Sequence, residues 1–196
     1  MIQSFQTQTW IVLFTVGWIL FTTPVSAQQS PQEVLDAVVR LQSTVPVDAR
    51  TALALGTERE GSGVVIDEQG LILTIGYLIL EAHSVTVTTR NGSSFDARIV
   101  AYDHATGFGL VHVTEPLEVS QLQFGQSGSL RVGDPVLAIS SGGSEPIVPS
   151  TVVSRREFAG YWEYLLEDAI FISPPQRFFS GSALIGLKNK LCTEAL

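Results

Sequence analysis

Residues 61–74 read GSGVVIDEQGLILT, and this stretch decides the fold class. Three β-branched residues, at 64–66, precede a polar turn that ends at Gly70, and a second apolar run follows from Leu71 to Thr74. Short apolar runs separated by turn residues are typical of β-hairpins. The stretch therefore predicts two antiparallel strands joined by a turn at residues 67–70.

Further strand signals follow at similar spacing along the chain. Val85 and Val87 alternate with polar residues up to Asn91-Gly92, which is the strongest short hairpin signal, and residues 95–102 return. Five more segments are of strand length, at residues 108–113, 136–139, 148–154, 158–166 and 169–172. Short strands of this kind separated by turns predict an all-β barrel or sandwich.

The segment before Gly61 allows two readings. Ser30-Pro31-Gln32-Glu33 has an N-cap serine, a proline at the first helical position and a glutamate three residues after the cap, and apolar residues follow at helical spacing. Residues 38–45 also suit a first strand, because β-branched residues recur there. The sequence leaves helix and strand open at this point.

The first 27 residues are typical of an export signal. They contain no charged side chain, and Trp10 to Phe21 form an apolar run as long as a secretory signal core. Val25 and Ala27 suit signal peptidase, so we expect cleavage after Ala27 and a periplasmic or secreted protein. The start of the chain lacks Lys and Arg, so the alternative is an uncleaved membrane anchor.

Composition excludes some partners. The 196 residues include 19 Asp and Glu against 11 Lys and Arg, a formal net charge of −8. Nucleic acid is therefore not an expected partner, since phosphate binding needs clustered cations. The single cysteine, Cys192, permits neither an intrachain disulfide nor a cysteine-rich metal site, and we expect its thiol to be exposed.

Near the C-terminus, residues 176–184 read QRFFSGSAL and form a candidate nucleophile turn. Ser180, between aromatic residues and a glycine, is placed to present its hydroxyl on a tight bend, with neighbouring N–H groups as an oxyanion site. A serine hydroxyl stays protonated unless a general base takes its proton. The location of a base therefore decides what Ser180 can do.

In order and spacing, these motifs resemble the high-temperature-requirement (HtrA) family of trypsin-like serine peptidases, over roughly residues 61–186. The resemblance implies two six-stranded antiparallel β-barrels with the site between them. It divides the chain into a signal peptide (1–27), an N-terminal segment (28–60) and a peptidase domain (61–196), with the first barrel ending near residue 120 and the second beginning near 121. At least one closing strand is missing after Ser180, so we expect the second barrel to be truncated.

The resemblance places Tyr77 at the position of the catalytic histidine and Gly107 at that of the aspartate, and only Ser180 matches the triad. Phe178 stands where the family favours glycine, so the oxyanion-like pair here is Phe178 and Ser180. Phenols titrate near pH 10 and imidazole near neutrality, so a tyrosine does not replace the histidine as a base. A glycine has no side chain to orient any base.

His104, next to Asp103 and three residues before Gly107, is the candidate substitute base. His83 and His112 are interpreted as surface residues of a turn and of a strand. One histidine beside one aspartate supplies too few ligands for zinc, so we expect no metal site and no cofactor.

These observations predict an exported peptidase homologue without catalytic activity. It would bind an extended peptide, or an unfolded or envelope protein, in the cleft between the barrels by edge-strand pairing. One alternative is an active serine endopeptidase that uses Ser180 with a non-standard base. Another is a structural envelope protein that forms oligomers through the open barrel edge.

Overall fold

The computed structural model describes residues 29–160, 165–186 and 190–192. The predicted signal peptide and its cleavage after Ala27 lie outside the described residues. Within the described ranges, no helix has the length and apolar character needed to cross a membrane.

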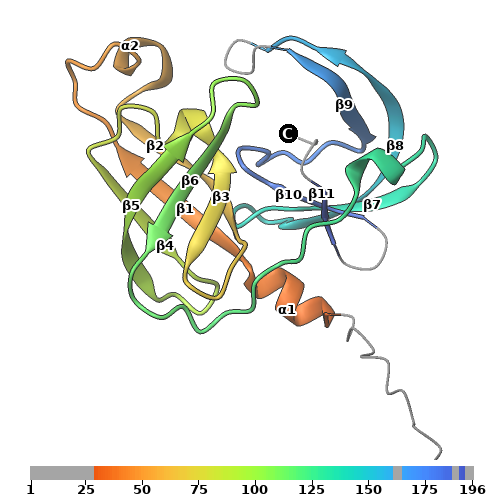
Figure 1. Ribbon diagram of the computed structural model, residues 1–196, viewed down its shortest axis with the longest axis horizontal. Coiled ribbons are helices and arrows are strands. Elements are labelled where there is room, and N and C mark those ends of the chain that lie inside the picture. Colours follow the sequence, from red (N-terminus) through yellow and green to blue (C-terminus); the bar gives the residue numbers. More distant parts are fainter. Residues whose placement is uncertain (1–28, 161–164, 187–189, 193–196) are drawn as a thin grey trace, which may run out of the picture.

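Strands make up most of the described chain, which confirms the all-β class (Figure 1). In order, the elements are α1 (Pro31–Asp36), β1 (Val38–Thr44), α2 (Ala52–Leu55), β2 (Glu58–Val65), β3 (Leu71–Ile75), the 3-10 turn η1 (Gly76–Leu78), β4 (Ser84–Thr88), β5 (Ser94–Tyr102), β6 (Phe108–Val113), the 3-10 turn η2 (Ser127–Ser129), β7 (Pro135–Ile139), β8 (Ile147–Phe158), β9 (Leu166–Ser173), β10 (Ala183–Ile185) and β11 (Leu191–Cys192).

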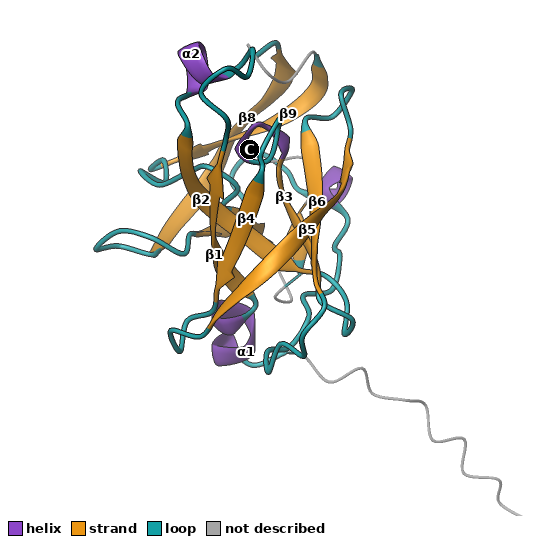
Figure 2. Cartoon of the chain, turned by 90° about the vertical axis from the view of Figure 1, so that its left-hand side faces the viewer, coloured by secondary structure: helices purple, strands orange, loops and turns teal. Residues whose placement is uncertain are grey.

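The first half of the molecule is a closed antiparallel barrel with the strand order β1-β2-β3-β6-β5-β4 (Figure 2). Both hairpins predicted from the sequence are present, as the pairs β2–β3 and β4–β5. In the first hairpin, Asp67 Oδ1 accepts the N–H groups of Gln69 and Leu71, which fixes the turn. Alternate side chains fill the interior, and Leu41 and Ile72 are fully buried there.

The segment before Gly61 contains both of the elements that its sequence allowed, a helix followed by a strand. Ser30 Oγ accepts the N–H of Glu33, and the Glu33 carboxylate accepts the N–H of Ser30, so a reciprocal cap begins α1. The helix ends at Asp36, and β1 begins at Val38 and pairs with both β2 and β4. The β-branched run therefore supplies a strand of the first barrel.

Among the described residues, the second half is an open, curled sheet with the strand order β11-β10-β7-β8-β9 (Figure 1). Strand β9 is a free edge, whereas Leu191 of β11 is hydrogen-bonded to Gln123 and Gly125 of the connecting segment. The predicted trypsin-like double-barrel fold is confirmed, with a closed first barrel and a half-barrel sheet in the described part of the second. The expectation of an exposed Cys192 is wrong: its side chain is 5% exposed. Cys192 pairs with Leu184 of β10 and packs in a cluster with Leu130 and Val136, so what looks like a polar tail supplies part of a core.

The two halves share a hydrophobic core. It combines Val34 of α1, Val64 of β2, Leu122 of the connecting segment, Ile139 of β7 and Ile185 of β10, all of them buried. The N–H of Leu122 also donates to the carbonyl of Val65. Helix α1 and the connecting segment therefore hold the open sheet against the barrel.

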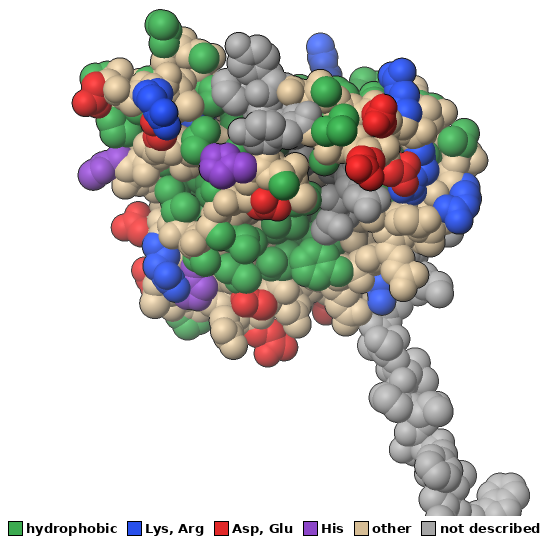
Figure 3. All heavy atoms as spheres, turned by 45° about the horizontal axis from the view of Figure 1, so that its top comes forward, with side chains coloured by type: hydrophobic (Ala, Val, Ile, Leu, Met, Phe, Trp, Pro, Cys, Tyr) green, Lys and Arg blue, Asp and Glu red, His purple; other side chains and the backbone are tan. Residues whose placement is uncertain are grey.

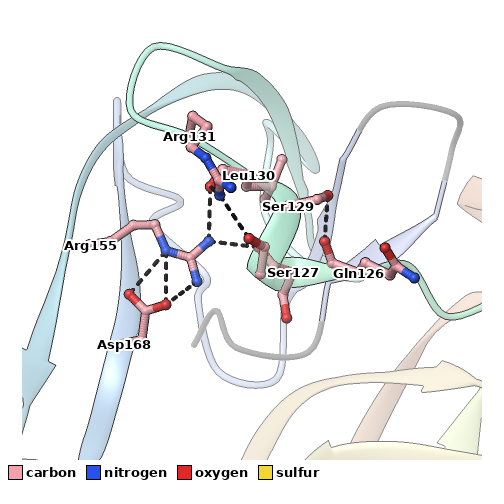
Figure 4. Close-up of polar contacts among 8 residues, drawn as sticks. Gln126, Ser127, Ser129, Leu130, Arg131, Arg155 and Asp168 are labelled. Carbon is pink, nitrogen blue, oxygen red and sulfur yellow. Dashed lines mark hydrogen bonds and ion pairs between the residues drawn. The ribbon is translucent and has the colours of Figure 1, made fainter.

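Arg155 of β8 organises one side of the open sheet (Figure 4). Its Nη1 donates to the carbonyls of Ser127 (2.6 Å) and Leu130 (3.0 Å), and its Nε donates to both carboxylate oxygens of Asp168 on β9 (3.0 and 3.1 Å). One largely buried guanidinium thus ties the turn η2 to two strands.

Candidate functional site

The Ser180 turn lies against strand β2 of the first barrel. The N–H of Ser182 donates to the Phe179 carbonyl (2.9 Å), which closes the turn, and the N–H of Ser62 donates to the Ser180 carbonyl (2.8 Å). Gly181 has φ +67°, and a Cβ atom there would lie 2.1 Å from the Ser62 carbonyl oxygen. Only glycine allows this turn to come so close to β2.

Tyr77 faces Ser180 across the junction of the two halves. It stands in η1, directly after β3, and its phenolic oxygen shares a hydrogen bond with Ser180 Oγ. Both residues are half-buried. The Ser180 hydroxyl therefore has a tyrosine hydroxyl as its side-chain partner.

Gly107 lies beside Gly76, the residue before Tyr77. Its carbonyl accepts the N–H of Gly76 at 2.6 Å, and it occupies the left-handed region at φ +75°, at the end of a turn closed by its N–H to the Asp103 carbonyl. The structure thus brings the three predicted triad positions together. Ser180 supplies a hydroxyl and Tyr77 a phenol, whereas Gly107 supplies no side chain.

Of the two predicted oxyanion donors, one is engaged. The N–H of Phe178 donates to Gln176 Oε1 at 3.3 Å, and Gln176 Nε2 donates to the Glu145 and Pro146 carbonyls at 3.3 and 3.4 Å. The ring of Phe178 lies over Gly143 so closely that a Cβ atom there would be 2.2 Å from it. The side chain of buried Gln176 thus accepts the Phe178 N–H, which would otherwise be available to an oxyanion.

The N–H of Ser180 makes no hydrogen bond to another residue in the described ranges. Of the predicted donor pair, this leaves only the Ser180 N–H unengaged. Oxyanion stabilisation depends on donors that already point to one position. The turn therefore retains at most part of such a site.

None of the three histidines reaches the serine. His104 is exposed and makes an edge-on ring contact with Tyr102, with centroids 4.4 Å apart. His83 is exposed, and His112 lies in β6 with a buried Nδ1 that has no hydrogen-bond partner. In the described part of the chain, no histidine is hydrogen-bonded to Ser180, and no group of three metal-ligating residues occurs.

Arg59 was not singled out from the sequence, although it holds the turn that carries Tyr77. It is 5% exposed, and its Nη1 donates to the carbonyls of Tyr77 (2.6 Å) and Leu80 (2.9 Å). Its Nη2 donates to Thr51 Oγ1, which in turn donates to the Glu81 carboxylate. Burial lowers the pKa of the Arg59 guanidinium, and the nearby Glu81 charge opposes that effect.

Two serines connect the halves beside the site. Ser62 Oγ accepts the N–H of Ser141 and shares a hydrogen bond with Ser141 Oγ, both at 3.0 Å. Ser62 is 2% exposed, and its backbone also holds the Ser180 carbonyl. The loop at residues 140–146, β2 and the Ser180 turn therefore form one connected polar unit.

The family model described as "Trypsin-like peptidase domain" matches residues 61–192. The chain belongs to that family. Among curated relatives, a probable periplasmic serine protease do/HhoA-like from Haemophilus influenzae is 32% identical over 67% of this chain and 29% of its own length. The periplasmic serine endoprotease DegP of Escherichia coli is 30% identical over 67% of this chain and 28% of its own. The HtrA resemblance is confirmed.

Solved structures agree on the fold. The HtrA-type protease AlgW with a tripeptide has a TM-score of 0.67 at 22% identity, covering 83% of this chain and 52% of that one. AlgW with a decapeptide has a TM-score of 0.65 at 20% identity, covering 82% and 55%. This trypsin-like domain thus spans about half of those chains and less than a third of the two curated relatives.

Proposed function

We propose that this chain is a catalytically inactive, exported member of the trypsin-like peptidase family that binds an extended peptide in the cleft between its two halves. The observation that carries the proposal is the hydrogen bond between Tyr77 and Ser180 Oγ. A tyrosine occupies the place where a serine peptidase needs its general base.

The chemistry supports inactivity at each step of acyl transfer. Attack on a carbonyl requires the serine proton to pass to a base, and Gly107 offers no side chain that would orient one. Removing the base together with serine activation typically costs about 10⁴–10⁶ in rate. The Phe178 N–H, already engaged by Gln176, adds little stabilisation of an oxyanion.

Two pockets beside the loop at residues 140–146 support peptide binding. One, of about 430 Å³, is lined by Gln176, Arg177 and Phe178 of the Ser180 turn together with the loop. The other, of about 310 Å³, is lined by both halves of the molecule. The AlgW structures were solved with peptides, and this chain shares their fold.

Hydrophobic surface near the junction also favours a polypeptide ligand. Figure 3 shows hydrophobic side chains gathered into a continuous area on the face turned forward, with acidic side chains along its margin. Phe178 and Phe179, on the Ser180 turn, are 54% and 63% exposed. Exposed apolar patches with polar rims commonly mark binding surfaces.

Export is part of the proposal. The DegP and do/HhoA-like relatives are named as periplasmic proteins, and residues 1–27 have the composition of a signal peptide. The predicted mature chain then begins at Gln28. Terminal sequencing of protein recovered from the cell envelope tests the cleavage after Ala27.

A second candidate, assembly into envelope oligomers, is favoured by the open sheet. Among the described residues, strand β9 has one neighbouring strand, so it presents backbone donors and acceptors along its free side. Strand β11 at the other end is covered, because the N–H and carbonyl of Leu191 are bonded to Gln123 and Gly125. Oligomers formed through the β9 edge would dissociate on dilution. Sedimentation velocity over a hundredfold concentration range distinguishes them from a monomer.

The decisive experiment for the main proposal combines cleavage and binding. We expect the purified protein to leave unfolded casein intact, with the same result for Ser180→Ala, and to bind fluorescent extended peptides. Casein cleavage that Ser180→Ala abolishes would establish the enzyme alternative. Inactivity without any peptide binding would leave assembly as the better account.

A further inference from the structure

The 310 Å³ pocket between the two halves is basic. Arg40 of β1 and Arg90, which follows β4, line it on the barrel side, and Ser140, Ser141 and Gly143 line it on the loop side. No acidic residue is among its described lining residues. A basic pocket stands out in a chain whose formal net charge is −8.

Arg90 is available to a ligand. It is exposed, and it makes no ion pair or hydrogen bond with another residue in the described ranges. Arg40 is paired with Glu60 at 2.6 Å, which uses one of the five N–H donors of its guanidinium. Counting Arg40, Arg90 and Glu60 together, the pocket carries a net charge of about +1 at neutral pH.

The loop also carries backbone donors without a protein acceptor in the described part of the chain. The N–H groups of Gly142, Gly143 and Ser144 donate to no other described residue. Gly143 has φ +84°, a left-handed conformation of the kind that turns successive N–H groups toward one side. Of these three residues, Gly143 lines the pocket together with Arg90, and an unengaged amide beside an arginine is typical of sites that bind carboxylate or phosphate.

The pocket also adjoins the Ser180 site. Ser141 lines the pocket and is hydrogen-bonded to Ser62, whose N–H holds the Ser180 carbonyl. The Phe178 ring lies against Gly143, another lining residue. A peptide lying beside Ser180 needs only a few extended residues, at about 3.3 Å each, to place a side chain in the pocket.

We infer that this basic pocket binds the carboxylate of an aspartate or glutamate side chain in the peptide that occupies the cleft. The inference rests on the proposed peptide binding and adds the chemical class of the ligand. A free small anion binds weakly at a net charge of about +1 in an exposed pocket. A carboxylate carried by a bound peptide gains from an effective concentration in the millimolar range.

The test uses two sets of fluorescein-labelled decapeptides of alternating valine and threonine. One set carries a single glutamate at each position in turn, and the other carries glutamine at the same position. We expect glutamate to bind about three- to tenfold more tightly than glutamine at one or two adjacent positions in 50 mM salt, since charge-assisted bonds are screened at a surface.

Arg90→Gln should remove this preference and leave the affinity for the glutamine peptides unchanged. Arg98→Gln is the matched control, because Arg98 is also exposed and lies on β5 outside the pocket lining. A second readout is the Nε–Hε NMR signal of Arg90, which should shift with the glutamate peptide and stay in place with 10 mM acetate.

Each other outcome overturns a different statement. Equal binding of glutamate and glutamine peptides at every position would overturn the carboxylate subsite while leaving peptide binding intact. A shift of Arg90 by acetate as large as that by the peptide would show a site for free small anions instead. Failure of every peptide to bind would overturn the proposed function and this inference with it.

Discussion

The closed first barrel and the open second sheet differ in how their strands are paired. Every strand of the first barrel has two neighbours, whereas β9 and β11 of the second sheet have one each. The site lies where the two meet, with Tyr77 in the turn after β3 of the barrel and Ser180 in the turn before β10 of the open sheet. The site keeps its place at the junction of the two halves, and the proposed inactivity means that its chemistry has been lost on both sides.

The largest expected effect is a difference in stability loss between two variants, each of which truncates a buried isoleucine in one half. Ile72→Ala, at a fully buried barrel position, should lower the free energy of unfolding by about 2–5 kcal/mol. Ile170→Ala should cost about half as much, because Ile170 lines a cavity of about 240 Å³ and already lacks contacts on one side. Urea titration measures both, and equal losses would contradict the difference in packing.

A second prediction concerns the polar support of the open sheet. Arg155→Gln should lower the free energy of unfolding by about 2–3 kcal/mol, because it leaves the Ser127 and Leu130 carbonyls without their charged donor. Arg98→Gln, at an exposed site on the barrel, should stay within about 0.5 kcal/mol. Hydrogen exchange should then show faster opening in β8 and β9 than in the barrel.

The hydrogen bond between Tyr77 and Ser180, which joins the two halves, contributes less to the free energy of unfolding. Tyr77→Phe removes the phenolic partner of Ser180 and should cost about 0.5–1.5 kcal/mol, since the site is half-exposed and water can replace the hydroxyl. The fold should persist, because Arg59 holds the Tyr77 backbone and not its side chain. Loss of folding in this variant would mean that the hydroxyl pair stabilises the junction more than its exposure allows.

The smallest effect is a pH dependence on the barrel side. Hydrogen bonds from the Thr51 hydroxyl and N–H hold the pKa of the Glu81 carboxyl below its ordinary value of 4.5. This contribution to stability is present above pH 4.5 and is lost as the pH falls through the lowered pKa. Thr51→Ala should flatten the stability curve below pH 5, whereas Thr114→Ala, at an exposed position, should not.

The hairpins and the N-cap at Ser30 were predictable because turn residues and alternation act over a few positions. The meeting of Tyr77, Gly107 and Ser180 could be anticipated only through spacing shared with a family, since these residues are up to 103 positions apart. Local pattern carries no information on contacts of that range.

Other features of the structure could not be predicted from the sequence pattern. Arg59 stands between two glutamates, a pattern typical of a surface residue. In the structure it is buried and donates to the carbonyls of Tyr77 and Leu80. The side chain of Gln176, which engages the Phe178 N–H, is polar and unremarkable in the sequence. Cys192 follows a polar run and reads as exposed, although pairing with β10 buries it. Each depends on long-range packing.

The central claim is that Ser180 has lost its nucleophilic power, and covalent labelling tests it most directly. The full chain is incubated with a fluorophosphonate probe beside Ser180→Ala and an active serine peptidase, and intact mass is recorded. The account predicts an adduct on the active peptidase alone. One stoichiometric adduct on the natural chain that is absent from Ser180→Ala would contradict it.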